Sequence, residues 1–233
     1  PIIFRYIEDA KAANPDLKII VADPRRSESA EIADLHLPIK PGSDIALFNG
    51  MLHVLINEGM VDQAYIDAHT SGFAALSEIV KNYSPATVAE ICGIDAAAIV
   101  QAAKWFGGSG ASLSMYCQGL NQSAHGTHNN AGIIHLHLAT GQIGKSGAGP
   151  FSLTGQPNAM GGREVGGLSN LMSAHRDLAN PAHRAEMAQF WGVPFVPATP
   201  GKSAVDLFKS LKTGEIKAVW IACTNPAQSL PNQ

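Results

Sequence analysis

The feature that most constrains this chain is a long stretch rich in glycine and amide side chains, between residues 112 and 167. A short apolar run at Ala111–Cys117 leads into the polar turn GLNQSAHGT, and a helical pattern follows at Asn129–Thr140. The rest, 141–167, is far longer than the usual connection of about 4–6 residues. Glycine lets a backbone approach a ligand closely, and amides offer uncharged donors and acceptors. The stretch therefore predicts a wall around a large polar ligand. Its amides are Asn121, Gln122, Gln142, Gln156 and Asn158.

Short apolar runs followed by polar turns predict an α/β fold. Lys18–Ala22 and Ala218–Ala222 have the continuous apolar pattern of buried parallel strands, like Ala111–Cys117. In open α/β sheets, ligands bind beyond the carboxyl ends of the strands. Asp23 can accept hydrogen bonds from a guanine or ribose there, and Arg25 can hold a phosphate. A surface turn with an ion pair is the other interpretation of Asp23-Pro24-Arg25.

A second polar turn, Pro41-Gly42-Ser43-Asp44, precedes a helical pattern that Gly59 ends. Ser43 is expected to cap this helix and Asp44 to favour its positive end. The same helix start can receive a nucleotide group, while simple capping explains the residues equally well. Residues 61–106 predict four short helices without recognisable chemistry.

The glycine-rich Gly107–Gly110 is the best candidate for a linker between lobes. We therefore expect two Rossmann-like, doubly wound α/β lobes with mostly parallel sheets. The first spans 1–106 and the second 107–233, with loop 141–167 facing a cofactor.

Composition excludes several classes of partner. A net charge of −3 gives no indication of nucleic acid binding, and no apolar run approaches the ~20 residues of a membrane span. No leader pattern occurs at the start. Cys92, Cys117 and Cys223 form neither a CxxC pair nor a zinc pattern, so reduced thiols in the cytoplasm are expected.

Two competing site patterns are weak. Residues 139–146, ATGQIGKS, match a relaxed phosphate loop, but a helical pattern precedes them where an NTPase needs a strand. The histidines lack the further ligands that a structural zinc needs, so no metal ligand is assigned. They are His125, His128, His135 and His137. No GxSxG elbow and no GxGxxG after a strand occur, which argues against a hydrolase and a nicotinamide site.

Four segments, taken together, resemble the prokaryotic molybdopterin oxidoreductases, which bind a molybdenum bis(guanine dinucleotide) cofactor. They are VADPR at 21–25, PIKPGSD at 38–44, the stretch 112–167, and CTNPAQSLPN at 223–232. Within the family, GLNQSAHGT and FSLTGQPNAMGGREVGG are similar to nitrate reductases, above all assimilatory catalytic subunits. A formate dehydrogenase more often has RGQNN where this chain has TGQPN at 154–158.

The resemblance implies residue roles. Gln122 is expected to lie near the metal. Arg163 is expected to bind an anion, either the cofactor's pyrophosphate or nitrate. Gln118 stands where periplasmic nitrate reductases have Met, which puts its own contact in doubt. The implied cofactor-binding residues are Asp23, Pro24, Arg25, Gly42, Ser43, Asp44, Gln118, Gln122, Gln156 and Asn225.

The resemblance also implies that nitrate is reduced to nitrite, with electrons from ferredoxin, flavodoxin or an NADH-fed subunit. The chain starts at Pro1 rather than Met, and it lacks the cysteine cluster of the family's 4Fe-4S centre. We therefore expect an internal fragment that is inactive alone, with the molybdenum ligand and the cluster outside it. A formate dehydrogenase and a non-catalytic nucleotide-binding scaffold module are the alternatives.

Overall fold

The computed structural model describes residues 2–156 and 158–230, which divide into two compact units, Pro1–Leu153 and Thr154–Gln233. Pro1 lies outside the described residues. So do Pro157 of TGQPN and residues 231 and 232 of the last motif.

The first unit begins with a helix and a pair of parallel strands. The elements are α1 (Ile2–Ala13), β1 (Ile20–Ala22), α2 (Glu28–Glu31) and β2 (Leu35–Leu37). Strand β1 pairs with β2 in parallel, with Ile20 opposite Leu35. The strand predicted at Lys18–Ala22 is therefore confirmed, shortened at its start. The connection from β1 to β2 contains one short helix, α2, which is a single turn.

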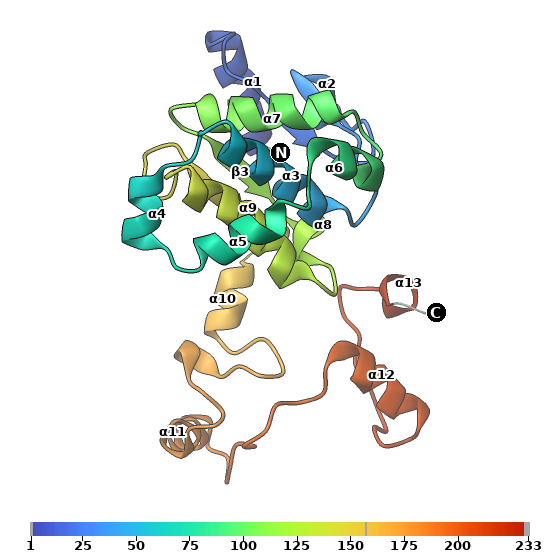
Figure 1. Ribbon diagram of the computed structural model, residues 1–233. Coiled ribbons are helices and arrows are strands. Elements are labelled where there is room, and N and C mark those ends of the chain that lie inside the picture. Colours follow the sequence, from blue (N-terminus) through green and yellow to red (C-terminus); the bar gives the residue numbers. More distant parts are fainter. Residues whose placement is uncertain (1, 157, 231–233) are drawn as a thin grey trace. The chain divides into compact units, whose positions relative to one another are not determined.

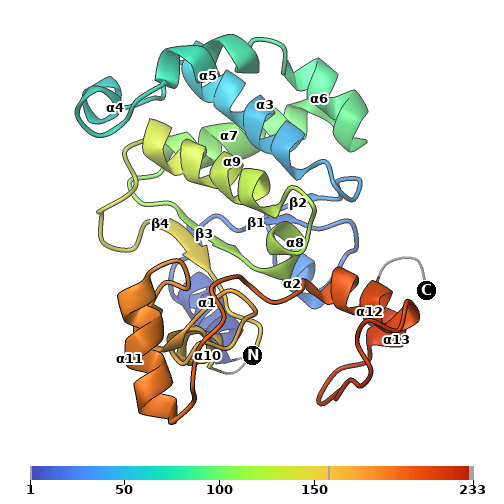
Figure 2. The same ribbon diagram turned by 90° about the horizontal axis from the view of Figure 1, so that it is seen from below.

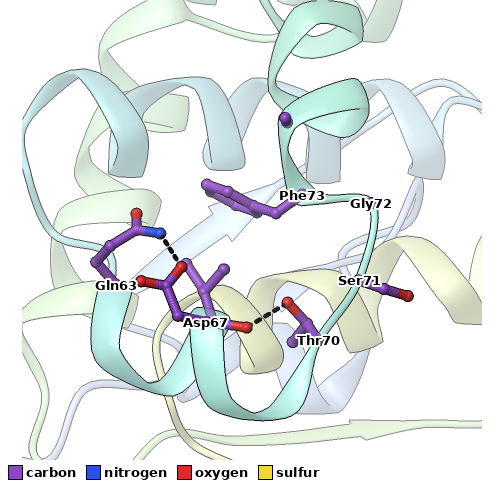
Figure 3. A pocket seen from close by; sticks show the side chains of 8 residues that line it. Gln63, Asp67, Thr70, Ser71, Gly72 and Phe73 are labelled. Carbon is purple, nitrogen blue, oxygen red and sulfur yellow. Dashed lines mark hydrogen bonds between the residues drawn. The ribbon is translucent and has the colours of Figure 1, made fainter.

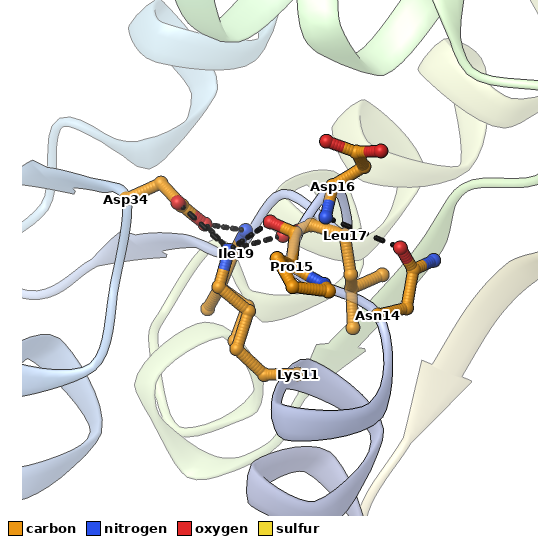
Figure 4. A network of polar contacts seen from close by, with 7 residues as sticks. All are labelled: Lys11, Asn14, Pro15, Asp16, Leu17, Ile19 and Asp34. Atoms are coloured by element: carbon orange, nitrogen blue, oxygen red, sulfur yellow. Dashed lines mark hydrogen bonds and ion pairs between the residues drawn. The ribbon is translucent and has the colours of Figure 1, made fainter.

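Lys11 and Asp34 join α1 to this strand pair (Figure 4). Lys11 Nζ donates to both carboxylate oxygens of Asp34, at 2.9 and 3.0 Å, and to the carbonyls of Pro15 and Leu17. Asp34 Oδ2 also accepts the backbone N–H of Ile19 at 2.8 Å. The hydrogen bond from Lys11 and the one from Ile19 lower the pKa of Asp34. The network holds the end of α1 beside the start of β1.

The middle of the first unit is helical. Its elements are α3 (Asp44–Asn57), α4 (Gln63–His69), α5 (Phe73–Val80), α6 (Pro85–Cys92) and α7 (Ala96–Gly108). The four short helices predicted for 61–106 are thus confirmed. Asp62, Ser84 and Asp95 cap α4, α6 and α7 by accepting backbone N–H groups, as such side chains do at helix starts. Gly93 ends α6 with φ +72°, a left-handed conformation that suits glycine.

The end of the first unit is a second parallel strand pair with a helical crossover. Its elements are β3 (Leu113–Tyr116), α8 (Gln118–Asn121), α9 (Gly126–Ala139) and β4 (Gly149–Ser152). Leu113 lies opposite Gly149 and Tyr116 opposite Ser152. The α/β class with short parallel sheets is therefore confirmed. The loop predicted at 141–167 is corrected, because β4 and a later helix interrupt it.

The core of the first unit lies around α3. Leu47, Leu52 and Leu55 of this helix are almost fully buried, and α5, α6, α7 and α9 all contact it. Figure 2 shows these helices on one side of the strands and α1 on the other. Figure 1 shows the same helices, in blue to yellow-green, gathered into one body. Four helices thus pack against a central one that starts just after β2.

The second unit is helical in the part that the structure describes. Its elements are α10 (Ala159–Glu164), the 3₁₀ helix η1 (Ser173–His175), α11 (Pro181–Trp191), α12 (Ala204–Lys212) and α13 (Pro226–Ser229). Met172, Leu178 and Met187 are its buried apolar side chains among the described residues. The strand predicted at 218–222 is absent, and Trp220 there is 93% exposed. That prediction was wrong for this chain, because the described residues of the second unit contain no other strand to pair with the segment.

The first two glycines of the expected linker, Gly107 and Gly108, are helical. Gly107 and Gly108 are the last turn of α7, and a Cβ on Gly107 would overlap Leu55 Cδ2 of α3. Gly107 therefore packs against the core, and neither glycine forms a loop. The compact units meet at 153/154, whereas the lobes 1–106 and 107–233 remain a prediction about the domains of a longer protein.

No single helix within the described residues is long and apolar enough to cross a membrane. Helices α6 and α7 together have the length and the apolar composition of a membrane span, but a bend of 113° separates them. Val88 of α6 and Ile99 of α7 are fully buried in the core.

We expect Gly107→Ala to destabilise the chain, because the added methyl must displace the fully buried Leu55 from a packed core. Overpacking of this kind costs about 1–3 kcal/mol. Gly108→Ala is the matched control, since its Cβ would meet only Met60 Cε at 3.6 Å. Urea unfolding of both variants is the measurement. Equal stability of the two variants would contradict the close approach of α7 to α3.

A buried histidine links α9 to β3 and α7. His137 is 0% exposed, its Nε2 lies 2.7 Å from Ser114 Oγ, and its ring meets Phe106 edge-on at 4.9 Å. Nδ1 has no hydrogen-bond partner among the described residues. An unpartnered lone pair costs less than an unpartnered N–H, so Nε2 carries the proton and donates to Ser114. Burial lowers the pKa of His137 to about 4.

This histidine makes the stability of the chain depend on pH. The unfolded chain protonates His137 near its ordinary pKa of 6.5, before the folded chain does, so the free energy of unfolding falls from pH 6.5 to about 4. The loss is about 3 kcal/mol at most. We expect His137→Gln to flatten this slope in urea unfolding at pH 7, 6 and 5. The exposed His128→Gln is the control, and an unchanged slope in His137→Gln would contradict the assignment.

Candidate functional site

The turn after β1 presents one carboxylate and one guanidinium to solvent. Asp23 Oδ1 accepts the backbone N–H of Arg25 at 2.7 Å, which folds the turn back on itself. The Asp23 backbone is fixed from both sides: its N–H donates to Leu37 O, and His36 Nε2 donates to its carbonyl at 2.9 Å. Pro24 and Arg25 are exposed, and the Arg25 side chain forms no ion pair with any described residue. The other interpretation of Asp23-Pro24-Arg25, a surface turn with an ion pair, is therefore not supported.

The turn after β2 ends at an open helix start. Gly42 has φ +82° and no atom within 4 Å of a built Cβ, so the space beside it is free for a ligand. Ser43 occupies the N-cap position of α3, but its hydroxyl donates to Lys40 O at 2.6 Å instead of accepting from the helix. The capping role expected for Ser43 is thus corrected. Ser43 therefore caps none of the first N–H groups of α3.

Asp44 is the first residue of α3 and is partly buried. Burial raises the pKa of this carboxyl, while the hydrogen bond to its own backbone N–H lowers it. The charge of Asp44 is thus held where the positive end of the helix favours it.

Cys92 and Lys40 hold the turn after β2 in place by hydrogen bonds. Cys92 is fully buried, its thiol donates to Ser43 O at 3.6 Å, and its own carbonyl accepts the Lys40 N–H at 2.8 Å. Burial raises the pKa of the Cys92 thiol, so it is an unreactive core group. Sequence reasoning missed these supports, because Cys92 and Ser43 lie far apart in sequence and no pattern joins them. Sequence reasoning also missed His36, whose ring donates to the Asp23 carbonyl. Its position in the strand Leu35–Leu37 is a signal that the local sequence does contain.

The two turns lie at the carboxyl ends of neighbouring parallel strands, joined by the Asp23–Leu37 hydrogen bond. Their groups suit a guanine nucleotide. A guanine offers two adjacent N–H donors that one carboxylate such as Asp23 can accept. Phosphates suit the unpaired Arg25 and the uncapped start of α3 beside Gly42. The residues present therefore fit a nucleotide end of a cofactor.

The third predicted turn follows β3. Gln118 opens α8 and Gln122 is the C-cap of that helix, with its N–H donating to Gln118 O. The Gln122 and Asn121 side chains are exposed, so they are accessible to a ligand. Gln142, which the sequence placed on the same wall, is instead 2% exposed and its Oε1 accepts Ser112 N–H at 3.1 Å. Gln142 therefore holds the start of β3 and does not face a ligand.

The remaining predicted residues belong to the second unit and are described with it alone. Gln156 precedes α10, Arg163 lies in its last turn, and both are exposed. Arg163 forms no ion pair within the described residues, not even with the adjacent Glu164. Asn225 is exposed at the N-cap position of α13, and its side chain does not cap that helix. Their roles toward a cofactor or an anion stay predictions.

Two hollows of the surface lie away from these turns. A hollow of about 350 Å³ lies between the end of α4 and the start of α5. Figure 3 shows Asp67 there with its carboxylate bound by Gln63, at 2.7 Å, and the Phe73 ring alongside. A second, of about 500 Å³, is lined in part by Arg176 and Glu186. Arg176 is paired with Glu186 through two hydrogen bonds, so its charge is already neutralised.

Competing sites receive no geometric support. No group of three His, Cys, Asp or Glu side chains that could hold a metal occurs in the described part of the chain. Residues 139–146 follow helix α9 instead of a strand, and β4 comes after them where an NTPase needs a helix. Lys145 of this segment is exposed.

Comparison with known proteins agrees with this arrangement. The family model described as molybdopterin oxidoreductase matches residues 1–233. The nitrate reductase of Synechocystis sp. is 45% identical over 100% of this chain and 33% of its own length. Formate dehydrogenase H of Escherichia coli is 34% identical over 98% of this chain and 32% of its own length. The chain thus spans about a third of the length of these relatives.

A solved structure shares the fold. Acetylene hydratase from Pelobacter acetylenicus matches with a TM-score of 0.56 and 33% identity, over 61% of this chain and 20% of that one. The family match covers the whole chain, including the turns after β1, β2 and β3. This chain therefore belongs to the molybdopterin oxidoreductase family, which works with a molybdenum–molybdopterin cofactor.

Proposed function

We propose that this chain is the part of a nitrate reductase catalytic subunit that holds a molybdenum bis(guanine dinucleotide) cofactor. The observation that carries the proposal is whole-chain similarity at 41–45% identity to several nitrate reductases, against 34–35% to formate dehydrogenases, although one assimilatory nitrate reductase catalytic subunit also stands at 34%. The difference matters because both groups of relatives match nearly all of the chain. The substrate is therefore nitrate, which with two electrons and two protons gives nitrite and water.

The guanine dinucleotide form of the cofactor is supported by the strand-end turns of the first unit. Asp23 accepts from the guanine base and Arg25 holds a phosphate. Gly42 leaves room for the nucleotide beside the uncapped start of α3. Ser43 and Asp44 complete that contact, while Pro24 shapes the first turn. When bound, the cofactor supplies the two-electron, oxygen-transfer chemistry, and the protein supplies binding and orientation.

The residues proposed to face the reacting end are amides and one arginine. Gln122, exposed at the end of α8, orients the cofactor or substrate by uncharged hydrogen bonds. Arg163, exposed and without an ion pair among the described residues, attracts the anion. Gln118, Gln156 and Asn225 contribute further hydrogen bonds to the cofactor.

The rest of the enzyme lies outside this chain. We place the molybdenum ligand and a 4Fe-4S cluster in other parts of the longer protein, which works in the cytoplasm. Ferredoxin, flavodoxin or an NADH-fed subunit is its electron donor. The chain by itself is inactive, and tightly bound molybdenum in the isolated chain would contradict this. Formate dehydrogenase remains the second candidate, because such a relative also matches nearly the whole chain.

The test uses the full parent reading frame, expressed in a host that makes the cofactor. We expect molybdenum near one per chain, about two GMP, and formation of nitrite from nitrate driven by reduced viologen. The same preparation is assayed with formate and an oxidised dye as the control. Formate oxidation without nitrate reduction would move the substrate to formate. Absence of both metal and nucleotide would leave a non-catalytic scaffold module.

A further inference from the structure

A short segment between α10 and α11 holds two residues in a backbone conformation that side chains disfavour. Ala174 and His175 have φ +56° and +58°, in the left-handed region that residues other than glycine rarely adopt. Such strain persists only where surrounding contacts impose it, and strained residues are concentrated at active sites and ligand contacts. The segment is therefore a candidate for a ligand contact.

Arg176 imposes this conformation from one side. Its Nη1 donates to the carbonyl of Ser173 at 3.2 Å, across the two strained residues. Its Nε donates to Glu186 Oε2 at 2.8 Å, and its Nη2 donates to the other oxygen of the same carboxylate. Glu186 belongs to α11, so this helix anchors the guanidinium. Ser173, Arg176 and Glu186 thus form a clamp across the strained pair.

The other side of the segment is fixed against α10, the helix that carries Arg163. Ser173 Oγ donates to the carbonyl of Val165 at 3.0 Å. A Cβ on Gly166 would lie 3.0 Å from the backbone nitrogen of Ser173, so the two stretches of backbone are in close contact. Arg163 lies two residues before Val165, and His175 lies two residues after Ser173. The fold therefore brings the backbones of Arg163 and His175 together.

The side chains of Arg163 and His175 are available to a ligand. Both are exposed, and neither side chain forms a hydrogen bond or an ion pair with a residue that the structure describes. A small oxyanion has several oxygens that accept hydrogen bonds. It can therefore accept from a guanidinium and from an imidazole N–H at the same time.

We propose that His175 contacts the same small oxyanion as Arg163 and helps to select it. Arg176 and Glu186 are positioning residues that act through His175. A hollow of about 500 Å³ lies beside the clamp, so the strained pair has room to relax once the clamp is broken. The inference rests on the proposed function, which places the substrate anion at Arg163.

Replacement of His175 in the full parent protein is the direct test. We expect His175→Ala to raise the KM for nitrate, and the Kd of nitrate for the oxidised enzyme in titration calorimetry, at least about 10-fold, because a hydrogen bond to a charged group is lost. The value of kcat, the molybdenum content and the GMP content are expected to change little. His175→Gln keeps an N–H donor and is expected to recover most of the affinity. Unchanged nitrate affinity in His175→Ala would overturn the proposal.

A matched pair of ion-pair variants in the parent tests the clamp. Glu186→Gln breaks the ion pair with Arg176 and is expected to raise the KM for nitrate by a factor similar to that of His175→Ala. In the double variant the two effects are not expected to add, because both act through the same contact. Glu215→Gln breaks the Lys202–Glu215 ion pair of the same unit and is expected to leave the KM unchanged. Additive effects, or equal effects of Glu186→Gln and Glu215→Gln, would contradict the positioning role.

The outcomes separate this inference from the proposed function. A parent that reduces nitrate, with unchanged nitrate affinity in His175→Ala, would refute the contact alone. A parent that oxidises formate but does not reduce nitrate would refute the nitrate reductase assignment. In that parent a raised KM for formate in His175→Ala would support the anion contact, and an unchanged KM would refute it.

Discussion

The close approach of three helices to α3 is the contact on which the first unit depends. Gly50 of α3 faces Val88 of α6, where a Cβ would lie 2.9 Å from Val88 Cγ2. Gly132 of α9 faces Phe48 of α3, and Gly107 of α7 faces Leu55. At each of these contacts one partner has no side chain, which lets the backbones come close. A densely packed interior leaves little room for even one methylene, so these glycines fix the helices around α3.

This packing positions the candidate site, because α3 begins where β2 has just ended. The buried side of α3 is held by its neighbours, while its first turn stays open to solvent beside Gly42. The Ser43 hydroxyl, which could have closed that turn, is used by Lys40 O. Since Asp23 is tied to Leu37 on the neighbouring strand, the carboxylate and the open helix start are held by one rigid framework.

Much of this could be predicted from local patterns. The periodic apolar residues and the caps at Ser84 and Asp95 predict the helices of residues 61–106, because such signals act within a few residues. The polar turns after β1 and β3 are equally local, and the motifs in them carry the family resemblance. The cofactor itself could be inferred only from that resemblance, since Asp and Arg after a strand are also common in surface turns.

The failures depend on contacts that are distant in sequence. The interpretation of Gly107 as part of a linker missed its contact with Leu55, which cannot be seen in the local sequence, whereas the lobes 1–106 and 107–233 stay a prediction. Gln142 has the composition of a ligand wall but is used inside the fold by Ser112. The pattern at 218–222 describes a buried strand correctly in composition, yet a strand needs a neighbour that the described part of the second unit lacks. Local sequence can indicate that a segment needs a neighbouring strand, but it does not show whether such a strand is present.

The central claim is that the turn after β1 recognises the guanine of the cofactor, and Asp23→Asn in the full parent protein tests it most directly. Asparagine keeps the oxygen that accepts the Arg25 N–H, but it replaces the second carboxylate oxygen and the charge that a guanine requires. Losing hydrogen bonds to a charged group costs about 1.5–3 kcal/mol, or roughly a 10- to 100-fold weaker affinity. We expect the GMP and molybdenum that stay bound after gel filtration to fall sharply, while Asp16→Asn, an exposed acidic residue before β1, retains both. Full GMP content in Asp23→Asn would contradict the account.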